Sequence, residues 1–215
     1  MTTGSRSIAL SELQLDALAE LVNLGVSRAA HSLAQMVQDE IVLSVPKVAL
    51  VSREEAIRTV AEREKANLIA VHQIFEGEIH GRALLIFPEE KSLELVRAVV
   101  GGEASLDEIM ELEQEALAET GNIILNGCLA TIANMLERSL KISLPEILHG
   151  ASVDLFNLQP PPPGGDSVLF IYINFIVRSR EIEGYIAMMM DLPSLTALQR
   201  LLNEFIRRTT GTSVE

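Results

Sequence analysis

One polar pattern occurs twice in the chain, and this repeat limits the folds that the sequence can adopt. The first copy consists of Asp16, Glu20, Asn23 and Pro46, and the second copy, 99 residues later, of Glu115, Glu119, Asn122 and Pro145. In both copies 22 residues separate the asparagine from the proline. Self-similarity of this regularity in 215 residues predicts two structurally equivalent halves.

Apolar residues around both copies follow a helical period. The first predicted helix begins at Ser11, for which the spacing predicts a capping box with Gln14, and runs to about Gln38. Its predicted core face is Leu18, Val22, Gly25, Ala29, Leu33 and Met36. A second helix is predicted from about residue 106 or 111 to Leu140. Its predicted core face is Leu117, Gly121, Ile124, Cys128, Ile132 and Met135. The repeated polar residues, with Ser27 and Asn126, then share the opposite face of each helix, because an α-helix has 3.6 residues per turn.

The segments after each long helix are rich in β-branched residues and predict strands. These strands are Ile41–Val51 with an interruption at Pro46, Asn67–Ile74, Glu76–Phe87, Ile147–Leu155, Ser167–Val177 and Ile182–Met190. Arg53–Lys65 is compatible with a short helix or a loop. The proline and glycine run Pro160–Gly165 predicts an irregular loop. The run Met188–Met190 is interpreted as strand core.

Each half is therefore predicted to contain a helix, strands and a second helix. Pro88 opens the closing helix of the first half at about Glu89–Val100, and Pro193 opens that of the second half, which ends at about Arg208. An isolated half would leave an uncovered sheet edge. We therefore predict an α+β fold over residues 1–215, in which repeats 8–102 and 105–208 share one mostly antiparallel sheet about a pseudo-twofold axis.

Composition excludes several classes of function. The net charge of −13 argues against a nucleic-acid partner, since phosphate backbones are bound by Lys and Arg. Cys128 is the single cysteine, which excludes an internal disulfide, and it is predicted to be a small buried hydrophobe. Apolar runs such as Ile186–Met190 are too short to span a membrane. The histidines lack metal-ligand spacing, so no metal site is predicted: His31, His72, His80 and His149. These features predict a soluble cytoplasmic protein without a membrane partner.

The polar helix faces are unusual for surfaces that only contact solvent, although duplication could also copy a neutral stripe. Each copy places two acidic residues at positions i and i+4, and such like-charge pairs cost about 0.2–0.5 kcal/mol in an exposed helix. Asparagine is also unfavourable inside helices. Both features favour a functional surface. Leu24 and Ile123, which adjoin the asparagines, are interpreted either as contacts for a docked partner or as partly buried residues.

The pattern Asp-x3-Glu-x2-Asn-x22-Pro resembles the signature of the CheC/CheX/FliY phosphatases of bacterial and archaeal chemotaxis. These proteins hydrolyse the aspartyl phosphate of the response regulator CheY. Two copies in one chain most resemble CheC, since CheX carries one site per chain and FliY adds a flagellar-switch domain. The resemblance implies a CheC-like α+β fold with two long helices that carry the active sites.

The resemblance also implies roles for individual residues. Asn23 and Asn122 would orient the attacking water, and Glu20 and Glu119 would pair with the regulator's lysine. Supporting motif positions are Asp16, Pro46, Glu115 and Pro145. Glu115 stands where the family commonly has Asp or Ser, so whether the second site equals the first stays open. The magnesium ion would belong to the regulator, and the chain would need no cofactor of its own.

Two other functions fit the same sequence. The chain could be a non-catalytic adaptor that binds the response regulator or the receptor deamidase CheD, which the resemblance implies as a further partner. It could also be a structural component of the flagellar switch, related through FliY. Intact Glu and Asn in both copies favour the phosphatase.

Overall fold

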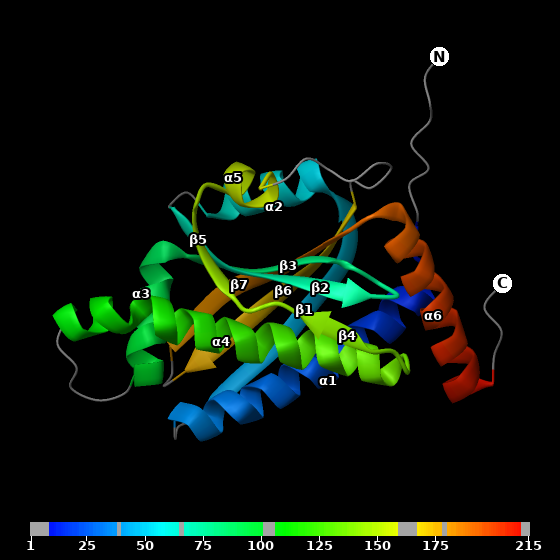
Figure 1. The fold of residues 1–215 in the computed structure, drawn as a ribbon, viewed down its shortest axis with the longest axis horizontal. Helices are drawn as coiled ribbons and strands as arrows, with labels where there is room; N and C mark the ends of the chain where they lie inside the picture. The colour runs from blue at the N-terminus through cyan, green and yellow to red at the C-terminus, as the bar shows by residue number, and fades with distance from the viewer. Residues whose placement is uncertain are drawn as a thin grey trace, which may run out of the picture.

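One antiparallel sheet forms the centre of the computed structural model, which describes residues 9–37, 40–64, 67–100, 106–158, 167–177 and 180–211 (Figure 1). Its strands are β1 (Ile41–Ser52), β2 (Leu68–Gly77), β3 (Gly81–Pro88), β4 (Leu140–Ile142), β5 (Glu146–Gly150), β6 (Ser167–Val177) and β7 (Arg180–Met190). The strand order is β1-β6-β7-β3-β2, and the outer edge of β2 pairs with both β4 and β5. The predicted α+β fold with a largely antiparallel sheet is confirmed.

Helices cover both faces of this sheet (Figure 1). One face packs against α1 (Glu12–Val37), α3 (Glu89–Val100), α4 (Leu106–Met135) and α6 (Leu192–Thr210). The other face packs against α2 (Arg53–Arg63) and α5 (Ser152–Phe156). Strand residues alternate between the two cores, as the two-residue period of a strand requires. In β2, for example, Ile69 and Val71 face the α1 and α4 layer, whereas Leu68 and Ala70 face the α2 and α5 layer.

The two halves differ where each motif proline lies. In β1 the pairing with β6 shifts register between Ser44 and Lys47, so Pro46 lies in a bulge of a continuous strand. In the second half the equivalent segment breaks into two strands, β4 and β5, on either side of residues 143–145. The predicted strand interruption at the motif proline is thus a bulge in the first half and a break between two strands in the second half. The domain limits and the repeat boundaries stay predictions.

Two further sequence predictions concern the α2 and α5 layer. Arg53–Lys65, left open between helix and loop, forms α2 as far as Arg63. The predicted strand Ile147–Leu155 is wrong beyond Gly150, because residues 152–156 form helix α5. The Asp154 carboxylate accepts a hydrogen bond from the Ala151 backbone N–H at 3.2 Å and so begins this helix. The predicted loop Pro160–Gly165 lies outside the described residues.

The predicted start of α1 is confirmed at the level of hydrogen bonds. The Ser11 N–H donates to Gln14 Oε1 at 2.8 Å, and the Gln14 N–H donates to Ser11 Oγ at 3.3 Å. The predicted core face of α1 is buried as far as Leu33. The prediction that Met36 belongs to this core face is wrong, since its side chain is 37% exposed. A helical period places residues on one face, but it does not define how far the covering layer extends.

Helices α1 and α4 pack against each other through glycines. A Cβ atom added to Gly25 would lie 2.8 Å from the Cα atom of Cys128 and 2.8 Å from the Gly127 carbonyl oxygen. One added to Gly121 would lie 2.4 Å from Val71 of β2. Because glycine has no Cβ atom, Gly25 and Gly121 allow α4 to approach α1 and the sheet closely. By length and composition Leu112–Met135 of α4 could cross a membrane, but 61% of its most apolar window is buried, as in a core helix.

The Cys128 thiol is fully buried, as predicted, and burial raises its pKa to about 12. The reactive thiolate is therefore scarce, and the sulfur is shielded by the contact of α1 with α4. We expect an aromatic disulfide reagent at pH 8 to label the native protein at least about 100-fold more slowly than the protein in denaturant. The measurement is the absorbance of the released thiolate. Complete labelling of the native protein within the time that denatured protein requires would contradict this burial.

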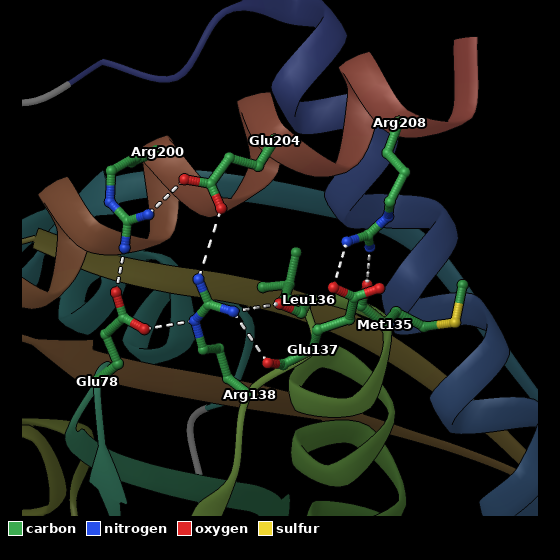
Figure 2. Close-up of polar contacts among 8 residues, drawn as sticks. All are labelled: Glu78, Met135, Leu136, Glu137, Arg138, Arg200, Glu204 and Arg208. Atoms are coloured by element: carbon green, nitrogen blue, oxygen red, sulfur yellow. Dashed lines mark hydrogen bonds and ion pairs between the residues drawn. The ribbon is translucent and has the colours of Figure 1, made fainter. Parts of the chain in front are cut away.

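A cluster of charged residues joins the end of α4 to α6 and to the turn between β2 and β3 (Figure 2). Its members are Glu78, Glu137, Arg138, Arg200, Glu204 and Arg208. Glu78 accepts from both Arg138 and Arg200, and Arg208 pairs with Glu137 at 2.9 Å. These side chains are 30–66% exposed, so each pair contributes little alone. The cluster anchors α6 at the C-terminal end of α4.

Candidate functional site

The polar residues of both motif copies lie on the outer faces of α1 and α4. The first polar site comprises Asp16, Glu20, Asn23 and Ser27, and the second polar site comprises Glu115, Glu119, Asn122 and Asn126. The four acidic side chains are exposed, and both motif asparagines are half-buried. Their helices lie side by side on one face of the sheet (Figure 1). The predicted placement of the motif residues opposite the core is therefore observed in both copies.

A hydrogen-bond network holds the asparagine of the second polar site. Asn122 Oδ1 accepts from Asn126 Nδ2 at 2.7 Å and from Gln73 Nε2 at 3.1 Å. Gln73 lies on β2, and its Nε2 also donates to the Ser143 carbonyl oxygen at 2.9 Å. Ser143 is held in turn by Ile74, whose backbone N–H donates to Ser143 Oγ at 2.9 Å. This network joins α4 to the segment that contains Pro145, and so it links Asn122 to the region of the second motif proline.

The first polar site lacks this network. Within the described part of the chain, neither Glu20 nor Asn23 makes a side-chain hydrogen bond. Ser27 occupies the position of Asn126, one repeat earlier. In the sheet, Ser44 pairs with Asn174 as Ser143 pairs with Ile74, so Ile173 occupies the place of Gln73. Ile173 is buried and offers no donor. The two asparagines are thus supported differently.

Apolar side chains are exposed around these sites. Leu144, which follows Ser143, is 86% exposed, and Leu24 beside Asn23 is 39% exposed. Ile123 is partly buried against the core. The interpretation of Leu24 as an accessible contact residue is therefore favoured, and that of Ile123 is partial burial. The exposure of Leu144 was not predicted from the sequence, and its counterpart in the first copy, Val45, is partly buried against the core.

Three of the four histidines contact a carboxylate side chain in the structure. His72 contacts Glu146 at 3.3 Å, His80 contacts Asp191 at 3.0 Å, and His149 contacts Glu89 at 3.4 Å. Among the described residues, no group of three or more His, Cys, Asp or Glu side chains could hold a metal ion.

The acidic side chains of both polar sites are exposed to solvent. A hollow of about 270 Å³ is lined by Lys47, Arg63, Tyr172 and Glu183 among others, and none of the eight residues of the polar sites borders it. Small-molecule sites are usually concave. Exposed side chains on two packed helices are better suited to docking against a protein surface.

Comparisons with known proteins include two family matches and two relatives. A family model described as chemotaxis phosphatase CheX matches residues 69–160, and a CheC-like family model matches residues 13–50. The CheY-P phosphatase CheC of Bacillus subtilis is 28% identical over 153 residues, which cover 68% of this chain and 69% of that protein. The CheC1 protein of Halobacterium salinarum is 24% identical over 143 residues, which cover 66% of this chain and 72% of that protein.

Solved structures share the fold. Thermotoga maritima FliY superposes with a TM-score of 0.71 at 17% identity, over 94% of this chain and 100% of that chain. The FliM middle domain from Helicobacter pylori superposes with a TM-score of 0.58 at 12% identity, over 89% of this chain and 99% of that chain.

The fold and the two family matches make this chain similar to the CheC-like chemotaxis proteins. The resemblance to the CheC/CheX/FliY family is confirmed, and CheC proteins are among the relatives that cover most of the chain. The CheC-like model covers the first motif copy, and the CheX model covers the second. Each motif copy therefore lies in a segment that is related to this family.

Proposed function

We propose that this chain is an aspartyl-phosphate phosphatase that dephosphorylates a CheY-like response regulator. The observation that carries the proposal is the pair of Glu–Asn motifs on adjacent helices of a CheC-like fold, in which Glu20 and Glu119 are exposed and Asn23 and Asn122 are half-buried. The relative from Bacillus subtilis is named a CheY-P phosphatase, which supports this reaction.

The chemistry requires positioning and charge stabilisation rather than a covalent intermediate on this chain. Hydrolysis of a phosphoryl group needs a water placed in line with the leaving oxygen. An Asn side-chain amide can orient such a water through hydrogen bonds. In our proposal Asn23 and Asn122 enter the regulator's active site and hold the water, and Glu20 and Glu119 pair with the regulator's lysine. The magnesium ion belongs to the regulator, and this chain supplies no cofactor.

The remaining motif residues have supporting roles in this proposal. Asp16 and Glu115 form the acidic rim next to each Glu, and the segments with Pro46 and Pro145 flank the helices. Exposed Leu24 and Leu144 supply apolar contact area for the docked regulator. The acidic surface gives no reason to expect a nucleic-acid partner. The reaction is proposed to take place in the cytoplasm, and CheD stays a predicted second partner.

Phosphate release from a phosphorylated CheY-like regulator tests the proposal. The chain is expected to accelerate release above the regulator's own rate, and Asn23→Ala and Asn122→Ala are each expected to remove only part of this acceleration. Asn134→Ala is the matched control, since Asn134 is an exposed asparagine on α4 outside both polar sites. Binding of phosphorylated regulators without faster release would contradict the phosphatase and favour the adaptor.

A further inference from the structure

Gln73 is a fully buried amide in an apolar row. It lies on β2 between Val71 and Phe75 and shares their face toward α1 and α4. Burying an amide costs free energy unless its polar atoms are paired. Gln73 pairs only in part, because its Oε1 is buried without a hydrogen-bond partner among the described residues. A buried polar atom without a hydrogen-bond partner is rare in native cores and lowers stability, so the presence of Gln73 here calls for an explanation other than stability.

The orientation of the Gln73 amide follows from a backbone group. The Ser143 carbonyl oxygen, 2.9 Å from Gln73 Nε2, can only accept a hydrogen bond. The amide nitrogen must therefore face Ser143, because the opposite orientation would place two acceptors against each other. One Nε2 hydrogen is used there, and the second points to Asn122 at 3.1 Å.

This orientation fixes the next amide. The Asn122 atom that faces the Gln73 donor must be the acceptor Oδ1, and Asn126 Nδ2 donates to the same oxygen at 2.7 Å. An amide oxygen has two lone pairs, so both are used inside the protein. The Asn122 amide nitrogen, with its two hydrogens, is then the polar atom left to face a docked partner.

We propose that Gln73 is a positioning residue of the second polar site, which sets Asn122 as a fixed hydrogen-bond donor toward the regulator's active site. The inference rests on the proposed function. Asn122 donates one hydrogen to the oxygen of the attacking water, whose protons then face the phosphoryl oxygens. Asn23 has no such support, because Ile173 replaces Gln73, and its amide oxygen is available to accept. The two sites thus hold water in different ways.

The test uses Asn23→Ala as the parent, so that turnover reports the second site. Adding Gln73→Leu keeps the buried volume but removes the donor, and kcat is expected to fall at least about tenfold, since small displacements of a positioning group are costly. KM is expected to change less than about twofold, because Leu144 and the acidic rim are untouched. Gln73→Glu, which when buried and neutral offers one donor hydrogen in place of two and so cannot serve both Ser143 and Asn122, is expected to show the same loss.

Two comparisons separate positioning from a loss of structure. Gln14→Leu in the same parent is the matched control, because Gln14 is also a buried amide, bonded to Asn203 at 2.6 Å, but lies outside both polar sites. It is expected to keep the parent's kcat. In the wild-type chain, Gln73→Leu and Asn122→Ala are expected to be non-additive, so that the double variant loses no more than Asn122→Ala alone. An unchanged kcat in both Gln73 variants, or equal loss in Gln14→Leu, would overturn the inference while leaving the proposed function intact.

Hydrogen exchange of the Gln73 side-chain amide tests its position without a regulator, whether or not the chain has phosphatase activity. Side-chain amide hydrogens of Gln73 are expected to exchange with solvent at least about tenfold more slowly than those of exposed glutamines in NMR spectra, since both are hydrogen-bonded and buried. The signal is assigned by its absence in Gln73→Leu. Exchange as fast as that of exposed side chains would overturn the proposed positioning directly.

Discussion

The double variant Asn23→Ala/Asn122→Ala will release phosphate from the phosphorylated regulator no faster than the regulator does alone. Both sites then lack the amide that holds the attacking water, and the loss of one well-placed group of this kind costs about 100-fold or more in rate. Binding is expected to persist, because exposed Leu24 and Leu144 and the acidic side chains beside the asparagines remain. The readout is phosphate release under single-turnover conditions, with binding of the regulator measured separately.

The acidic partners provide a contrasting pair of variants. Glu20→Gln/Glu119→Gln keeps both asparagines but removes the charges proposed to pair with the regulator's lysine. This double variant is therefore expected to lower both the affinity for the regulator and the rate of phosphate release. Asn134→Ala, with its exposed amide on α4, should match the wild-type chain in both measurements. Full activity of the double asparagine variant would exclude the assignment of both sites.

The local features of this fold were predictable from sequence because neighbouring residues determine them. The capping box of Ser11 and Gln14 needs only a spacing of three residues, and its two hydrogen bonds are present. The start of α3 after Pro88 is equally local. The paired polar faces followed from the helical period and from the repeat itself, which placed Asn23 and Asn122 at equivalent positions.

The features that the sequence could not indicate depend on contacts between distant segments. Gln73 and Asn122 are 49 positions apart and meet only because α4 crosses β2. The repeat even concealed this contact, since Ile173 stands at the equivalent place in the other half. The shared use of Glu78 by Arg138 and Arg200 is long-range in the same way (Figure 2). Helix α5 was missed because its β-branched and apolar residues suit a strand as well as one buried helical turn.

The contact of α1 with α4 sets the relative position of the two polar sites, and it depends on Gly25. Any side chain there would meet backbone rather than a movable side chain, since Cys128 Cα and the Gly127 carbonyl oxygen lie 2.8 Å from the added Cβ. Two opposing effects act on Gly25→Ala. Helix propensity favours alanine by about 1 kcal/mol, whereas overpacking against a fixed neighbour costs about 1–3 kcal/mol or more.

We expect the packing effect to exceed the propensity effect, so that Gly25→Ala lowers the free energy of unfolding by about 1–2 kcal/mol. The change is measured by urea denaturation monitored by circular dichroism. The slope of the unfolding free energy against urea concentration, the m-value, is expected to stay unchanged. Ser27→Ala is the matched control, because Ser27 is exposed on the same helix and gains only propensity, a few tenths of a kcal/mol. If Gly25→Ala proved as stable as Ser27→Ala, α1 and α4 could separate without cost. Their close approach would then not be what fixes the spacing between Asn23 and Asn122.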